Sequence, residues 1–137
     1  MTAIAIALAS VLLVLSGLHV FWAIRNRFEG SVVIPKVNGR PAFIPTRGIS
    51  LLVAAALGVA ALIALAQGHV LDVGSPAPLR WAAYAAGATF TARAIGDFRL
   101  VGFFKRIKGT DFARWDYYLF APLCALMGVS FLYLAQH

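Results

Sequence analysis

The stretch LRWAAYAAGATFTARAIGDF, residues 79–98, decides the fold, because it is a long run of mostly small and apolar side chains that also contains Arg93 and Asp97. A helix of about 20 residues is long enough to cross the hydrocarbon core of a bilayer. A charged side chain at membrane depth is costly, and its usual place faces protein or water rather than lipid. Residues 79–98 therefore predict a membrane span that carries a candidate functional site.

Composition indicates the same environment for the whole chain. Of its 137 residues, 61% are hydrophobic and only 12% are charged, whereas about a quarter of the residues of a soluble domain are charged. The mean hydropathy is +0.84. We infer an integral membrane protein with room for one helical bundle. The formal net charge of +7 lies in loops beside apolar runs, which argues against nucleic-acid binding, and the single cysteine, Cys124, excludes an intrachain disulfide.

Hydropathy predicts four transmembrane helices in one domain, residues 1–137. The spans are expected at about residues 2–24, 46–67, 76–98 and 111–135, so the predicted fold is an all-α, four-helix transmembrane bundle. Thr46 and Thr110 are expected to cap the helices that follow them. Pro122 lies inside the fourth span and cannot donate to the carbonyl of Tyr118, so we expect a kink there.

Loop charges predict the orientation of the spans. The first cationic loop contains Arg25, Arg27, Lys36, Arg40 and Arg47, and the second contains Arg99, Lys105, Arg106, Lys108 and Arg114. The first three residues, the 68–78 loop and the last two residues contain no Lys or Arg. Because cationic loops stay in the cytoplasm, both termini are expected on the outer side of the membrane.

Both cytoplasmic loops have features of their own. In the first, residues 31–45 form two extended arms around Asn38-Gly39, which predicts a short hairpin; an irregular lid and a plain connector are the alternatives, because Pro35, Pro41 and Pro45 limit strand pairing. The second loop combines aromatic rings with cations, which suits contact with an anionic membrane surface. Its predicted membrane-surface residues are Phe103, Phe104, Lys105, Arg106 and Lys108.

Polar side chains of different spans lie at one predicted depth. His19 and Arg93 each stand five residues from the cytoplasmic end of their predicted span, roughly 7 to 8 Å inside it at about 1.5 Å per residue. Arginine suits a carboxylate or phosphate, and histidine can exchange a proton near neutral pH. We therefore predict a cytoplasm-facing polar pocket for an anionic lipid or an amphiphilic small molecule. Its predicted ligand-binding residues are His19, Trp22, Arg47, Thr89, Arg93, Asp97 and Asp116.

Other interpretations stay open. In a purely structural one, Arg93 and Asp97 neutralise each other across one helical turn, and His19 bonds a backbone carbonyl. A small oligomeric transporter or channel is a second, and a membrane assembly or regulatory subunit is a third. Residues small enough to support a homo-oligomer are Ala83, Gly87 and Thr91.

Common enzyme motifs are missing from the sequence. It contains no H-E-x-x-H, no cysteine pair, no Walker loop and no glycine-rich dinucleotide fingerprint. His19 with Asp97 or Asp116 could form an acid/base pair, but no nucleophile is identified, so the catalytic residues and enzyme status stay open. We predict no metal and no cofactor. The expected partners are membrane lipids and other copies of the chain.

Two short elements connect the chain to a known family. They are R-x-I-G-D at residues 93–97 and G-F-F-K at residues 102–105, followed by Asp116 and Pro122-Leu123-Cys124. Through them, and more weakly through residues 17–22, the chain resembles a small bacterial membrane family catalogued as domain of unknown function 3995. The resemblance implies a four-span protein of the bacterial inner membrane, whose termini would then be periplasmic. It brings no assigned activity and no catalytic residues.

Overall fold

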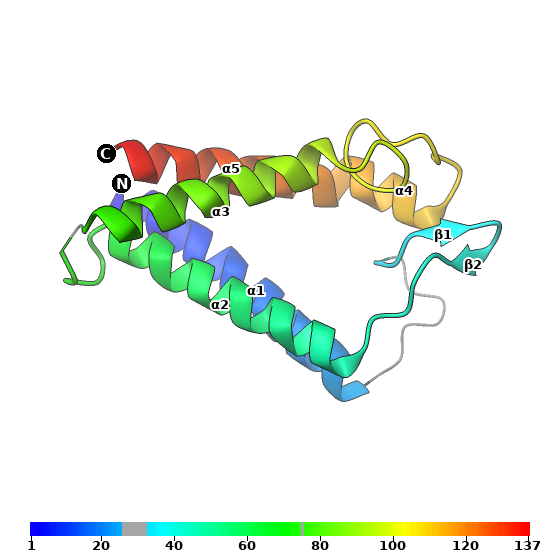
Figure 1. Cartoon of the computed structure of the whole chain (residues 1–137), viewed down its shortest axis with the longest axis horizontal. Helices are drawn as coiled ribbons and strands as arrows, with labels where there is room; N and C mark the ends of the chain where they lie inside the picture. The colour runs from blue at the N-terminus through cyan, green and yellow to red at the C-terminus, as the bar shows by residue number, and fades with distance from the viewer. Residues whose placement is uncertain (26–32, 75) are drawn as a thin grey trace.

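The computed structural model describes residues 1–25, 33–74 and 76–137, and Figure 1 shows their arrangement. The described chain is mostly helical, which confirms the all-α class. The long helices are α1 (Thr2–Arg25), α2 (Arg47–Gln67), α3 (Ala77–Ile95) and α5 (Ala121–Gln136). A short helix, α4 (Asp111–Trp115), and a π-helical turn, η1 (Asp116–Phe120), run directly into α5. Arg27 and the start of the predicted hairpin arm, residues 31 and 32, lie outside the described residues.

The helices pack as two antiparallel pairs, α1 with α2 and α3 with α5. The pairs lie together at the end that holds both termini, and they diverge toward the end that carries the long loops (Figure 1). Leu12, Phe131 and Leu134 are fully buried where the pairs meet. Thr2 Oγ1 also donates to the carbonyl of Gly68, 3.1 Å away, at this end. The hydrophobic core therefore closes one end of the bundle and leaves the other end open.

Small residues allow α3 and α5 to pack closely. A Cβ atom added to Gly87 would lie 2.8 Å from Leu132 Cδ2, and one added to Gly128 would lie 2.5 Å from Thr91 Oγ1. Ala83, one turn before Gly87, is completely buried. Ala83, Gly87 and Thr91 therefore pack against α5 within the chain, and formation of a homo-oligomer stays a prediction.

Three helical segments of the described chain are long and apolar enough to cross a membrane. They are Thr2–Arg25, Arg47–Gln67 and Asp111–Gln136. Helix α3 does not reach the same hydropathy, because Arg80 and Arg93 lie within its 19 residues among many alanines. The helix ends at Ile95, so Asp97 and Phe98 of the predicted third span belong to the loop that follows. Three apolar helices of this length indicate a membrane protein.

The first long loop contains the predicted hairpin. Strand β1 (Lys36–Val37) pairs with β2 (Arg40–Pro41) in antiparallel register, with Val37 opposite Arg40. Asn38 and Gly39 between them have φ angles of 51° and 76°, as a two-residue type I′ turn requires at both central positions. The hairpin prediction is confirmed, although each strand is only two residues long.

Local sequence signals also explain how the last helical segment begins and why it changes geometry. Thr110 Oγ1 accepts a hydrogen bond from the Ala113 amide at 3.0 Å, the predicted cap. The Ala121 amide donates to the carbonyl of Asp116, which is a π-helical hydrogen bond. Pro122 has no N–H to donate into a regular α-helix, so the irregularity expected there takes the form of a π turn. This turn begins at Asp116, a residue of the candidate site.

Candidate functional site

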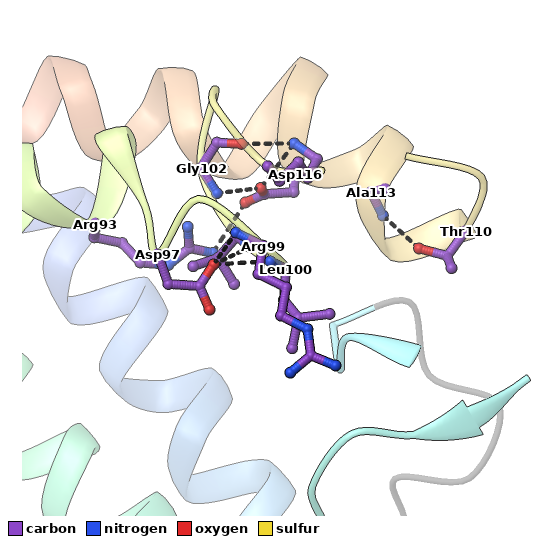
Figure 2. Close-up of polar contacts among 10 residues, drawn as sticks. Arg93, Asp97, Arg99, Leu100, Gly102, Thr110, Ala113 and Asp116 are labelled. Atoms are coloured by element: carbon purple, nitrogen blue, oxygen red, sulfur yellow. Dashed lines mark hydrogen bonds and ion pairs between the residues drawn. The ribbon is translucent and has the colours of Figure 1, made fainter. Parts of the chain in front are cut away.

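A buried carboxylate, that of Asp116, lies at the centre of the polar cluster (Figure 2). The residue is completely buried. Its Oδ1 atom accepts from Arg93 Nη2 at 3.0 Å, and its Oδ2 atom accepts from Lys105 Nζ at 3.0 Å. The backbone amide of Gly102 also donates to Oδ2, at 2.7 Å. A carboxylate can be buried when charged donors surround it in this way. Asp116 therefore joins the end of α3, the second loop and the last helical segment.

The loop reaches Asp116 because two glycines let its backbone turn and cross itself. Gly96 ends α3 with a φ angle of 88°, and Gly102 has a φ angle of 84°. A Cβ atom on Gly96 would collide with the carbonyl oxygen of Val101, and one on Gly102 would collide with that of Ile95. Only glycine combines this backbone conformation with such a close approach. The glycines of the R-x-I-G-D and G-F-F-K elements thus place the Gly102 amide on Asp116.

Asp97 stabilises the start of this loop and does not pair with Arg93. Its Oδ1 atom accepts hydrogen bonds from the amides of Arg99, Leu100 and Val101, at 2.9, 2.8 and 3.1 Å (Figure 2). These bonds, the Arg99 amide contributing most, hold the pKa of the Asp97 carboxyl below its ordinary value. The expected Arg93–Asp97 pair was wrong, because α3 ends before Asp97 and the two residues no longer share a helical face.

Lys105 also differs from its predicted place. It was expected at the membrane surface with Phe104, Arg106 and Lys108, which are all exposed. The Lys105 side chain is instead 2% exposed and donates both to Asp116 and to the carbonyl of Gly102, 2.7 Å away. The two acceptors compensate for the loss of water around the ammonium group. Lys105 is therefore a structural counter-ion of Asp116.

Arg93 connects this cluster to a cleft of about 420 Å³ between the two helix pairs. The cleft has an almost wholly apolar lining, with Leu57, Phe90 and Met127 among its residues. Arg93 is the one charged side chain in that lining among the described residues. Its Nη1 atom is buried and has no hydrogen-bond partner within the described part of the chain, whereas Nη2 bonds Asp116. Arg93 thus lines an apolar space and keeps one buried nitrogen, Nη1, without a hydrogen-bond partner among the described residues.

His19 and Trp22 of α1 line the same cleft. Their rings meet edge to face, with centroids 4.9 Å apart. His19 Nδ1 lies 2.8 Å from the carbonyl oxygen of Leu15. Because a carbonyl oxygen only accepts, Nδ1 carries the hydrogen of this bond, and Nε2 takes no part in it. The backbone bond proposed in the structural interpretation is present, and it leaves one ring nitrogen available.

The structure separates the predicted ligand-binding residues into three groups. His19, Trp22 and Arg93 line the cleft, whereas Asp116 is bonded to Arg93 and is itself buried. Arg47, Thr89 and Asp97 are exposed and are not among the residues that line the cleft. Thr89 donates to the carbonyl of Ala85 in its own helix, 2.8 Å away.

Sequence reasoning missed two kinds of site residue. It missed the contribution of Lys105 and Gly102 to the Asp116 cluster, although the recurrence of glycine and charge in G-F-F-K was a usable signal. It also missed the apolar lining, since residues such as Phe90 and Met127 have no chemical signature in an apolar sequence. Within the described residues, no three His, Cys, Asp or Glu side chains gather as a metal site requires. Among the described residues, the cleft combines an apolar wall with one cationic side chain, that of Arg93.

Three apolar helices and a buried charge cluster indicate a helical membrane protein with a cleft between its helix pairs. A protein-family model described as a protein of unknown function, DUF3995, matches residues 12–131. The chain belongs to this family, as the R-x-I-G-D and G-F-F-K elements predicted. No curated protein and no solved structure matches the chain.

Proposed function

We propose that the protein spans the bacterial inner membrane four times and binds an anionic amphiphile, a lipid or a small molecule, in the cleft. In this arrangement α3 is the remaining span, shielded by its partner α5. The hairpin and the 96–110 loop face the cytoplasm, and both termini face the periplasm.

Exposure and charge support this placement in a membrane. The outward surfaces of the apolar helices carry exposed aliphatic side chains, including Val14 at 65%, Leu52 at 70% and Leu126 at 64%. Such surfaces are stable in lipid and costly in water. The described cations of the two cationic loops lie at the end where the helix pairs diverge (Figure 1). The positive-inside tendency assigns that end to the cytoplasm.

The unpaired half of the Arg93 guanidinium is the observation that carries the binding proposal. Its Nη2 atom is held by Asp116, which orients the fork, and its Nη1 atom has no partner among the described residues. A carboxylate or phosphate accepts strongly from such a group. The cleft volume of about 420 Å³ lies in the range of small-molecule pockets. An apolar tail would fill the space near Phe90 and Met127 while the anionic head meets Arg93.

Thermal stabilisation by matched detergents tests this proposal. We expect dodecyl phosphate and laurate to raise the melting temperature of the protein in a neutral detergent, and dodecanol to have a smaller effect. Arg93→Met should abolish the difference between anion and alcohol. The control Arg80→Met removes the same charge from an exposed position of the same helix. It should preserve the difference in stabilisation between the anions and the alcohol.

Retained folding must be checked, because Arg93 also pairs with Asp116. Circular dichroism of Arg93→Met should show the helical content of the wild-type protein. Arg93→Lys keeps a charge for Asp116 but loses the second, planar donor face, so it should fold and still lose most of the anion preference. Equal stabilisation of Arg93→Lys and wild type by both anions would contradict the proposal, as would equal effects of dodecanol and laurate on the wild type.

A further inference from the structure

A second cavity lies beside the last helical segment and shares no lining residue with the cleft. It measures about 430 Å³ and is lined by the residues Phe103, Lys105, Lys108, Ala113, Arg114, Tyr117 and Tyr118. Residues 113, 114, 117 and 118 recur at helical spacing, whereas Phe112, Leu119 and Phe120 line the cleft from another face of the same segment. The two spaces therefore lie on different faces of one helical element.

Charge in this second cavity is positive and only partly neutralised. Lys105 is paired with the buried Asp116, and Arg114 makes an exposed pair with Asp111 at 3.3 Å. Lys108 is exposed and makes no ion pair within the described part of the chain. An exposed pair such as Arg114–Asp111 is weak, so Arg114 and Lys108 are both available to an incoming anion.

Aromatic rings form the rest of the wall and hold it in shape. The Tyr117 ring meets Phe103 edge to face at 6.1 Å and Tyr118 at 5.3 Å, and Lys105 Nζ lies 5.7 Å from its centroid. Tyr117 and Tyr118 are 52% and 74% exposed. Their hydroxyl groups can donate hydrogen bonds, which phosphate oxygens accept.

We propose that this cavity binds the phosphate of an anionic phospholipid headgroup at the cytoplasmic surface of the membrane. Lys108 and Arg114 supply charge, and Tyr117 and Tyr118 supply hydroxyl donors. The choice of a lipid over free phosphate follows from the neighbouring surface. Phe104 and Phe98 are exposed and in contact, with ring centroids 6.2 Å apart, and Trp115 is also exposed. Exposed aromatic rings beside cations are typical of the membrane interface.

Native mass spectrometry of the full-length protein with phosphatidylglycerol tests this site. We expect the wild-type protein to retain phosphatidylglycerol in preference to phosphatidylcholine with the same acyl chains. The double variant Lys108→Gln with Arg114→Gln should bind phosphatidylglycerol at least tenfold more weakly, since each cation near an anionic surface contributes about fivefold. The matched control, Lys36→Gln with Arg40→Gln, removes two cations from the hairpin and should change the affinity by less than about twofold.

Three results would overturn the proposal. The first is equal retention of the two lipids by the wild type. The second is an equal loss of affinity for phosphatidylglycerol in the double variant and in the control. The third is displacement of phosphatidylglycerol by millimolar inorganic phosphate. The double variant leaves Arg93 untouched, so its response to dodecyl phosphate and laurate reports on the cleft separately. The lipid-binding proposal for the second cavity can therefore fail without affecting the proposed function of the cleft. The cleft proposal can likewise fail without affecting the second cavity.

Discussion

Replacing Asp116 by Asn should be among the most destabilising conservative changes in this chain. The substitution keeps the size of the side chain but removes its negative charge and turns one acceptor into a donor. Asp116 Oδ1 faces Arg93 Nη2, and Oδ2 faces both Lys105 Nζ and the Gly102 amide. Either orientation of the new amide therefore places an NH₂ group against a donor.

The expected loss of folding free energy in Asp116→Asn follows from how deeply each ion-pair partner of Asp116 is buried. Removing one member of a buried ion pair costs about 3–5 kcal/mol, because the other charge stays buried without compensation. Lys105 is 2% exposed and meets this condition, whereas Arg93 is 33% exposed and can be partly hydrated. We therefore expect the lower figure, about 3 kcal/mol, which is roughly a hundredfold in the folding equilibrium constant.

Asp111→Asn is the matched control for this experiment. Asp111 pairs with Arg114 at 3.3 Å, but both side chains are 67% exposed. Such a pair contributes below about 1 kcal/mol. The free energies of unfolding can be compared by titrating each variant with urea in a neutral detergent and following the helical signal.

A second variant separates the buried charge from other effects. Asp116→Asn combined with Lys105→Met should recover part of the lost stability, because it removes the buried ammonium group that Asp116→Asn leaves without compensation. Equal destabilisation by Asp116→Asn and Asp111→Asn would refute the reasoning. So would a double variant that is less stable than Asp116→Asn alone.

The remaining predictions concern the loop after α3. Gly96→Ala should lower the free energy of unfolding by at least about 1 kcal/mol, because the φ angle of Gly96 is 88° and the new Cβ atom collides with Val101. The control Gly109→Ala has nothing near its Cβ position, so it should leave the free energy of unfolding nearly unchanged in the same titration. Asp97→Ala removes an acceptor of three amides and should cost about 1 kcal/mol at neutral pH, by analogy with helix caps. The folded-state pKa of Asp97 lies below the ordinary 3.8, so the stabilisation by its carboxylate is present above pH 3.8 and is lost as the pH falls through the folded-state pKa. The stability difference between wild type and Asp97→Ala should therefore shrink in acid. A difference that stays constant with pH would argue against stabilisation by the charged carboxylate.

Much of the secondary structure could be predicted because it follows from local patterns. The long apolar runs produced helices, Thr46 and Thr110 cap the helices that follow them, and Asn38-Gly39 formed the expected turn. Each of these features depends on residues within a few positions of one another. The local chemistry of a cap or a tight turn leaves few alternatives, so no knowledge of the tertiary fold was needed.

The partners of the charged residues could not be predicted in the same way. Sequence spacing placed Asp97 one helical turn after Arg93 and made a pair between them plausible. The actual partner of Arg93, Asp116, is 23 residues away along the chain. It reaches Arg93 only because α3 ends at Ile95 and two close-packed glycines fold the loop back. Helical spacing describes one helix, and it cannot say which faces of different helices meet.

By itself, the sequence determined the apolar helices, the short hairpin and the presence of unusual charges in residues 79–98. It did so because hydropathy and turn chemistry act over short distances along the chain. Only the tertiary structure decided that Lys105 is buried, that Asp97 caps a loop, and that Arg93 lines an apolar cleft while its Nη1 atom is buried without a hydrogen-bond partner among the described residues. These outcomes depend on long-range packing, which determines the burial of each charge and the donor or acceptor that compensates for it.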